Sequence, residues 1–281
     1  MTTTLFVPPG HFYSPIPDPA EAAARLRHIA GPLPASVPGI TMDVEAMSQF
    51  WRVLAQGMTD CDYRDERSEA RRYYYANDFY GYGDALIFRS ILKHVAPHRL
   101  VEVGSGFSSA VALDMRDAFG LPRELTFIEP YPEDRLRALL RPHDEACTRV
   151  LVNLVQDVPL EIFAALEVND ILFVDSSHVM KTGSDLHHIL FEILPCLHPG
   201  VVIHFHDIFW PFEYPAAWAV NQLRSWNEIY VLRAFLTGNA DYEILFFNDY
   251  YAKLHAAEVQ AAAPLVARNP GGGIWLRKLR G

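Results

Sequence analysis

The chain has 281 residues, of which 50% are hydrophobic and 21% are charged, a composition typical of a globular protein and not of a disordered or fibrous one. Its formal net charge of −10 at pH 7 argues against a nucleic-acid partner, because binding to a phosphate backbone requires clustered Lys and Arg. Cys61, Cys147 and Cys196 are too few and too widely spaced for a disulfide framework or a Cys-x-x-Cys metal pair. We therefore expect a small-molecule substrate.

Eight prolines fall within residues 1–40, around an Ala-rich helix predicted at 19–30. This pattern indicates an arm or cap over residues 1–70, which suits either a lid or exchange between the subunits of a homodimer. The chain starts without the basic and apolar segments of a secretion signal, and no stretch approaches the ~20 apolar residues of a membrane span. We therefore expect no membrane association and a cytoplasmic location.

Two further helices are predicted at 43–57 and 84–95, and the basic stretch between them, 64–72, is interrupted by acids and predicts a solvated surface. After Arg99 the pattern changes to short apolar runs separated by helices, which is typical of a parallel sheet. The predicted strands are 100–103, 125–128, 150–153, 171–174 and 201–205, and the predicted helices are 108–119, 134–140 and 185–196.

Two more strands, predicted at 242–247 and 273–276, indicate an antiparallel edge. Because β-α-β connections are right-handed, the five earlier strands predict an open, doubly wound α/β sheet. Ligands bind such a sheet at the carboxyl ends of its strands. The fold class is therefore a Rossmann-like sheet, with a main domain over residues 71–281.

A strand, a turn and a helix meet at residues 101–110, where the turn reads Gly104-Ser105-Gly106. The two glycines permit backbone angles and a close ligand approach that a Cβ would prevent. Such a turn between a strand and a helix is typical of nucleotide binding. We therefore predict that Gly104, Ser105 and Gly106 contact a cofactor.

The same turn also suits a dinucleotide, whose motif has a third glycine where this chain has Ser109. Glu102 is an awkward neighbour for a diphosphate, but it suits the ammonium of S-adenosylmethionine (SAM). Glu129 ends the second strand, where a carboxylate can accept hydrogen bonds from both ribose hydroxyls. Asp157, after the third strand, is either a contact for the adenine amino group or a helix cap. The pattern favours SAM over NAD(P).

With these motifs, the chain resembles the class I SAM-dependent methyltransferases and, within them, the small-molecule group called methyltransferase family 24. The resemblance spans roughly residues 70–210 and implies a seven-stranded sheet of order 3-2-1-4-5-7-6. It also implies SAM contacts at Glu102, Gly104, Gly106 and Glu129. The motifs that carry it are Glu-Val-Gly-Ser-Gly at 102–106, Phe-Ile-Glu-Pro at 127–130, Val-Asp-Ser-Ser-His at 174–178 and His-Phe-His-Asp at 204–207.

Polar residues at the ends of the fourth and fifth strands are the candidates for chemistry. O-methylation requires alignment of donor and acceptor and removal of a proton from the acceptor, which is a hydroxyl or a carboxyl group. Either His178 or His206 suits the base, since an imidazole titrates near neutral pH, and Asp207 lies beside His206. Alternation along the fifth strand favours His206, at its tip, for the cleft.

A divalent metal is the open alternative to a histidine base. Catechol-type methyltransferases hold magnesium with acids after strands four and five, and Asp175 and Asp207 fall at similar places. This chain has His206-Asp207 where those enzymes have an Asp-Asn pair, and imidazole with carboxylate suits iron, manganese or zinc better. The predicted ligands are Asp175, His206 and Asp207, and Asp175 is also a predicted cofactor contact.

Three functions remain open from the sequence. A small-molecule O-methyltransferase is favoured. The alternatives are an NAD(P)-dependent oxidoreductase on a similar sheet, and a non-catalytic or hydroxylase-like protein with the SAM fold.

Overall fold

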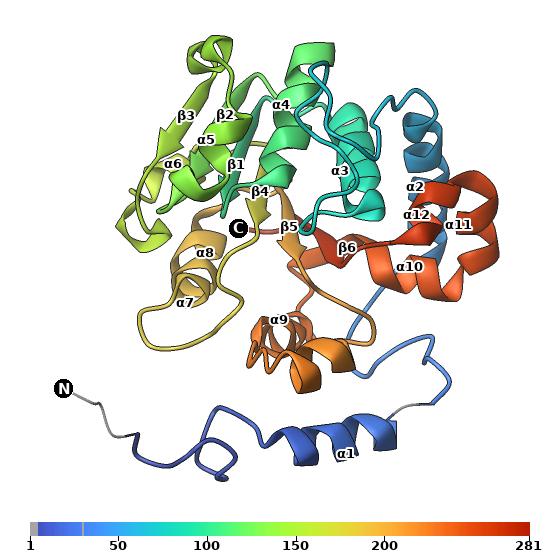
Figure 1. Cartoon of the computed structure of the whole chain (residues 1–281), viewed down its shortest axis with the longest axis vertical. Helices are drawn as coiled ribbons and strands as arrows, with labels where there is room; N and C mark the ends of the chain where they lie inside the picture. Colours follow the sequence, from blue (N-terminus) through green and yellow to red (C-terminus); the bar gives the residue numbers. More distant parts are fainter. Residues whose placement is uncertain (1–4, 30) are drawn as a thin grey trace.

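The computed structural model describes residues 5–29 and 31–281, and its centre is one seven-stranded sheet of order β3-β2-β1-β4-β5-β7-β6 (Figure 1). Strands β1 to β5 run parallel, and β7 lies antiparallel between β5 and β6. The predicted order and antiparallel edge are therefore confirmed. The strands are β1 Arg99–Val103, β2 Glu124–Ile128, β3 Thr148–Leu151, β4 Ile171–Val174, β5 Val202–His206, β6 Tyr242–Phe247 and β7 Gly273–Lys278.

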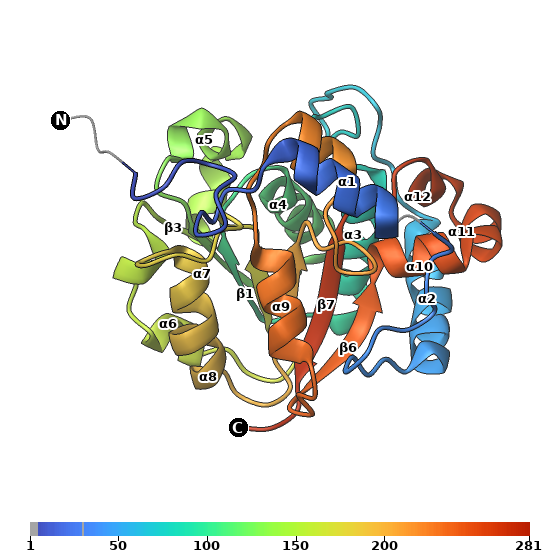
Figure 2. The same cartoon turned by 90° about the horizontal axis from the view of Figure 1, so that it is seen from below.

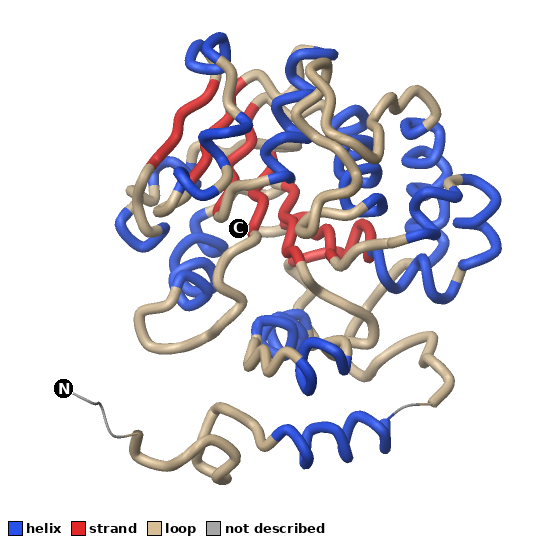
Figure 3. The backbone as a smooth tube through the Cα atoms, in the orientation of Figure 1, coloured by secondary structure: helices blue, strands red, loops and turns tan. Residues whose placement is uncertain are grey.

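Helices cover both faces of the sheet, as Figures 1 and 3 show. One face carries α3 (Tyr82–Val95), α4 (Phe107–Phe119) and the short α5 (Leu136–Leu139). The other carries α6 (Glu161–Ala164), α7 (Asp185–His188), α8 (Leu194–Cys196) and α9 (Glu228–Leu236), with a π-helical turn joining α7 and α8. Between β6 and β7 the chain forms α10 (Asn248–Leu254), α11 (Ala256–Ala262) and α12 (Pro264–Arg268).

The sequence pattern explains the core. Every residue of β4 and of β5 is buried, as expected for central parallel strands covered on both faces. Helix α2 (Val44–Met58) buries Met47, Trp51 and Leu54, which recur on one face at helical spacing, and Asp43 caps it by accepting from the Ala46 N–H at 2.9 Å. This helix packs on α3 and β6, so a segment assigned to the arm by the boundary at residue 70 contributes to the main core.

Residues 5–29 of the arm cross the side of the molecule that carries α7 and α9 (Figures 1 and 2). Helix α1 (Pro19–Ile29) of the arm lies against the π-helical turn Ala217–Asn221. Ala30, the predicted end of this helix, and residues 1–4 of the predicted arm lie outside the described residues. No helix in the described part of the chain is long and apolar enough to cross a membrane.

The prediction of a solvated surface at 64–72 is wrong for Arg72, which is buried. Its guanidinium lies 2.6 Å from a carboxylate oxygen of Asp117 and 2.7 Å from one of Asp144, and Asp114 accepts from its backbone N–H at 2.9 Å. The acids come from α4 and from the turn before β3, so the local sequence gave no sign of them. This network anchors the chain just before the aromatic run at 73–75.

Gly104 brings the turn after β1 against the end of β4. Its φ is +80°, and a Cβ there would lie 1.8 Å from the backbone oxygen of Asp175. Its N–H also donates to the carbonyl of Ile128 at 3.0 Å. Glycine is therefore required at this position because the backbone of Asp175, directly after β4, leaves no room for a Cβ.

We expect Gly104→Ala to lower the free energy of unfolding by about 2–4 kcal/mol, because it combines an unfavourable φ with overlap on a backbone atom. Gly120→Ala is the matched control, since Gly120 has a φ of +70° with open space around it. The control should lose only about 1 kcal/mol. Urea denaturation measures both, and equal losses would mean that the chain relieves the contact with Asp175 at little cost.

Candidate active site

Three cavities open at the carboxyl ends of the parallel strands, and Asp175, directly after β4, lines all three. A cavity of about 290 Å³ lies beside Glu129 and Gln156. A smaller one, of about 90 Å³, lies on the glycine turn. The largest, of about 910 Å³, is bounded by the loops after β4 and β5 and by residues 269–272, and we call it the large cavity.

The glycine turn is held by two side chains that accept hydrogen bonds from its backbone N–H groups. The N–H of Ser105 donates to Glu129 at 3.1 Å, and the N–H of Gly106 donates to the hydroxyl of Ser109 at 3.0 Å. Ser109, which replaces the third glycine of a dinucleotide motif, therefore stabilises the turn. The predicted cofactor residues Gly104, Ser105 and Gly106 all line the small cavity.

Glu102 lies beneath this turn and does not line any of the three cavities. Its carboxylate is buried and accepts hydrogen bonds from the hydroxyls of Ser108 and Ser109, the latter at 2.7 Å. Burial raises the pKa of Glu102 to about 8, although both serines act in the opposite direction. The side chain therefore holds the start of α4 in place and does not face the space predicted for an ammonium group.

The other two predicted nucleotide contacts differ in position. Glu129 lines the two smaller cavities and accepts from the N–H of Tyr131 at 2.8 Å as well as from Ser105. Asp157 is exposed and lines none of the three cavities; the neighbouring residues 154–156 line one instead. Position therefore supports a cofactor role for Glu129 more than for Asp157.

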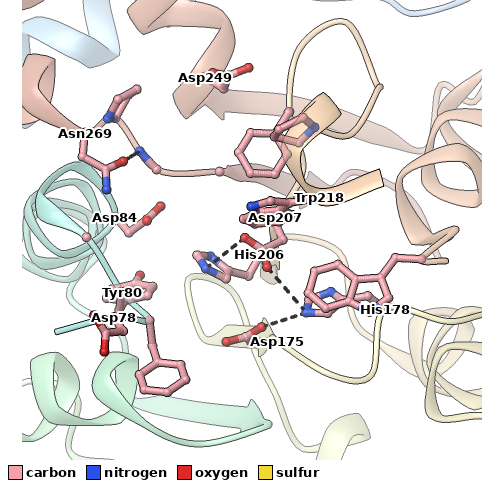
Figure 4. Close-up of a pocket in the computed structure, with 18 of the residues that line it drawn as sticks. Asp78, Tyr80, Asp84, Asp175, His178, His206, Asp207, Trp218, Asp249 and Asn269 are labelled. Carbon is pink, nitrogen blue, oxygen red and sulfur yellow. Dashed lines mark hydrogen bonds and ion pairs between the residues drawn. The ribbon is translucent and has the colours of Figure 1, made fainter. Parts of the chain in front are cut away.

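Asp175, His178 and Asp207 converge at the ends of β4 and β5, and we call them the acid–histidine cluster (Figure 4). The Nε2 atom of His178 lies 3.3 Å from Asp175 Oδ1 and 3.7 Å from Asp207 Oδ2. One potential ligand atom from each of the three residues lies within 4.8 Å of the others. The three side chains line the large cavity.

A fourth residue, Glu228 at the start of α9, orients the His178 ring. Its Oε2 atom lies 2.7 Å from Nδ1 of His178, and both side chains are buried. The carbonyl of His178 accepts from the N–H groups of Asn227 and Glu228, both at 3.1 Å. Trp226 packs on the ring, with the centroids 4.2 Å apart. His178 is thus fixed from behind, with Nε2 directed at the two aspartates.

His206 also lines the large cavity, as predicted, but it stands beside the acid–histidine cluster and not in it. Its Nε2 atom lies 3.5 Å from Asp207, and its ring packs near Tyr80 with the centroids 5.2 Å apart. Asp207 has a φ of +57°, and its carboxylate reaches toward both histidines. His178 therefore occupies the position beside Asp175 and Asp207 that the sequence prediction gave to His206.

The charges in this region influence one another. Burial opposes protonation of His178, but Asp175 and Glu228 raise its pKa well above the ordinary value. Burial alone would raise the pKa of Asp175, but His206 and His178 hold it below its usual range. Asp84, at the start of α3, faces the same cavity, and burial raises its pKa to about 7. Acids thus outnumber histidines, and the region favours positively charged ligands.

Sequence patterns do not point to Glu228 or to two arginines of this region. Glu228 lies 50 residues from its partner His178, outside every motif. The guanidinium of Arg135 lies 3.7 Å from the ring centroid of Phe79, between the glycine turn and the large cavity. Arg224 lies in the loop before α9 and lines the large cavity. None of the three belongs to a recognisable local pattern.

Comparison with known proteins gives a family and several remote structural similarities. Residues 101–208 match the family 24 methyltransferase model, described as a methyltransferase domain. A protein of Archaeoglobus fulgidus, described as uncharacterized, is 36% identical over 166 residues, which cover 58% of this chain and 74% of that protein.

Two solved structures illustrate the remote similarities. The O-methyltransferase TomG of Streptomyces achromogenes, in complex with SAM, is 14% identical over 93% of this chain and 96% of that one, with a TM-score of 0.43. The SAH-bound methyltransferase PaMTH1 of Podospora anserina is 13% identical over 99% of this chain and 100% of that one, with a TM-score of 0.44. Neither similarity is close enough to bear on individual side chains.

We expect Glu102→Gln to change how stability depends on pH. The folded protein keeps the Glu102 proton up to about pH 8, whereas the unfolded chain releases it from about pH 4.5, so this residue lowers stability as the pH rises between these values. The variant lacks this loss, and its free energy of unfolding should rise relative to the wild type by up to about 1.4 kcal/mol per pH unit.

Urea denaturation at pH 5, 6, 7 and 8 measures this difference. Glu161→Gln, at an exposed position in α6, controls for the loss of a surface carboxylate. A constant difference between Glu102→Gln and the wild type across this range would show that Glu102 is ionised in the folded protein.

Proposed function

Because the chain belongs to the class I SAM-dependent methyltransferases, we propose that it transfers a methyl group from SAM to a hydroxyl or carboxyl oxygen of a small molecule. The observation that carries this proposal is the position of Asp175, which is common to the two smaller cavities and the large one. A cofactor in the smaller cavities and an acceptor in the large cavity would meet at this carboxylate. Methyl transfer requires such a meeting, since donor carbon and acceptor oxygen must lie in line.

The two smaller cavities suit the two halves of SAM. We assign the adenosine to the cavity beside Glu129 and Gln156, and the methionine portion to the glycine turn. Each carboxylate oxygen of Glu129 accepts one backbone N–H, which leaves lone pairs for the ribose hydroxyls. Gly104 and Gly106 keep the turn free of side chains where the cofactor would approach.

In the proposed reaction, the acceptor oxygen loses its proton and forms a bond to the methyl carbon, while the carbon–sulfur bond of SAM breaks. The product S-adenosylhomocysteine (SAH) leaves as a neutral thioether. The acid–histidine cluster lies where that proton would be released. One ring nitrogen of His178 is directed at Asp175 and Asp207, and the other is hydrogen-bonded to Glu228. The ring is therefore held in one orientation at the place where the proton would be released.

The same cluster fits a divalent metal, which we propose as its occupant. Three carboxylates surround one imidazole, so a bound cation would balance excess negative charge. The pairing of His178 with Glu228 resembles the outer carboxylate that commonly orients a metal-binding histidine. Asp175, His178 and Asp207 would be the ligands, and this set suits manganese, iron or zinc better than magnesium. When bound, such an ion lowers the pKa of an acceptor oxygen and orients it.

The cofactor assignment predicts that SAH binds and NAD⁺ does not, as isothermal titration calorimetry would measure. Glu129→Gln should weaken SAH binding about tenfold, because it removes the charged acceptor for the ribose hydroxyls. Glu133→Gln, an exposed neighbour that lines none of the three cavities, should leave the affinity unchanged. Tight NAD⁺ binding without SAH binding would instead support the oxidoreductase alternative.

The metal assignment predicts that dialysed protein binds one Mn²⁺ or Zn²⁺ per chain, measured by elemental analysis and titration. Asp207→Asn should weaken the binding by at least about tenfold, and Glu228→Gln by about 10–100-fold through loss of the histidine orientation. Asp78→Asn is the matched control, since Asp78 lines the large cavity outside the cluster. Equal affinity in Asp207→Asn and the wild type would contradict the metal site.

A further inference from the structure

Trp218, Arg224 and Trp226 line the large cavity and lie in the segment between β5 and α9. Figure 4 shows Trp218 near Asp207. The guanidinium carbon of Arg224 lies 4.1 Å from the ring centroid of Trp218 and 4.6 Å from that of Trp226. The two indoles meet edge to face, with their centroids 5.6 Å apart. The backbone N–H of Arg224 donates to the carbonyl of Trp218 at 3.0 Å. Arg224 is therefore held over both aromatic faces.

Within residues 5–29 and 31–281, no carboxylate lies within ion-pair distance of Arg224. Lys253, another cation of the same cavity, has a partner in Asp249 at 2.6 Å. A guanidinium that is fixed on indoles keeps its N–H donors for a ligand, and its planar geometry matches a carboxylate or a phosphate. Arg224 thus has the properties of a binding group for an anion.

The position of Arg224 relative to the acid–histidine cluster indicates how a ligand would be oriented in the large cavity. The ring centroids of Trp226 and His178 lie 4.2 Å apart, and the guanidinium carbon of Arg224 lies 4.6 Å from the ring centroid of the same Trp226. A single indole therefore separates the arginine from the histidine. The carboxylates of Asp175 and Asp207 repel an anionic group from the cluster itself. A ligand with an anionic end would therefore place that end at Arg224 and its remaining oxygens toward the cluster.

We propose that the methyl acceptor carries an anionic group, a carboxylate or a phosphate, that binds to Arg224 while a hydroxyl of the same molecule faces the acid–histidine cluster. This inference rests on the proposed methyl transfer and adds the class of acceptor to it. The neighbouring indoles and Phe209, which meets Trp218 edge to face at 5.2 Å, provide apolar surface for the carbon skeleton between the two groups.

Simple probes test the anion site without knowledge of the natural acceptor. Benzoate, phenyl phosphate and the neutral benzamide share one ring, and each is titrated into the protein by calorimetry and by tryptophan fluorescence. We expect both anions to bind at least about tenfold more tightly than benzamide, because only they can pair with the guanidinium.

Three variants locate the effect. Arg224→Gln should lose the preference for anions, whereas Arg224→Lys should keep a weaker preference, since charge without the planar fork remains. Lys93→Gln is the matched control, because Lys93 also lies over an aromatic ring, Phe119 at 5.1 Å, but lines none of the three cavities. Thermal unfolding verifies that each variant is folded, and Arg224→Lys serves as the folded test if Arg224→Gln is not.

The outcomes separate this inference from the proposed function. Equal binding of benzoate, phenyl phosphate and benzamide to the wild type would overturn it, as would an unchanged anion preference in Arg224→Gln. SAH binding is measured in the same proteins and should be unaffected by Arg224→Gln. A wild type that does not bind SAH contradicts the methyltransferase proposal, and with it the assignment of the anion as a methyl acceptor. A wild type that binds SAH but shows no preference for anions contradicts only the role of Arg224.

Discussion

The contact between Gly104 and the backbone of Asp175 is the constraint on which the candidate site depends. The turn after β1 lies against the first residue after β4 because no side chain stands between them. The two strands are hydrogen-bonded neighbours, and the N–H of Asp175 donates to the carbonyl of Val103 at 2.9 Å. The glycine turn and the carboxylate that borders all three cavities are therefore placed by the hydrogen-bonded strands β1 and β4.

Electrostatics constrains the other half of the site. Four acids, Asp84, Asp175, Asp207 and Glu228, lie around two histidines in a region largely removed from solvent. Buried carboxylates are tolerated when they are paired or hydrogen-bonded, and here each histidine has acidic neighbours. The excess of acid is suited to a cation, while the positive charge of Arg224 lies on the other side of one indole.

The sequence predicted the features that depend on local pattern, and it missed those that depend on distant partners. The strands and the glycine turn follow from periodicity and short motifs, the strand order follows from the family resemblance that those motifs carry, and the structure has all three. His206 was placed correctly in the cavity by strand alternation, but alternation stops at the end of β5, where Asp207 takes a positive φ. The orientation of His178 by Glu228 and the burial of Arg72 by acids of other elements require the folded chain.

The division of the cleft also explains why the cofactor is easier to infer than the acceptor. The proposed cofactor side consists of backbone turns at the ends of β1 and β2, where glycine and one carboxylate give a recognisable pattern. The proposed acceptor side is the large cavity, which is lined by side chains from separate segments of the chain, including residues 77–81, 209–226 and 269–272. The first of these follows directly from the segment that the buried Arg72 anchors to α4. The shape of the large cavity therefore depends on a polar network outside it. If the proposed acceptor binds there, its selection depends in part on residues that never touch it.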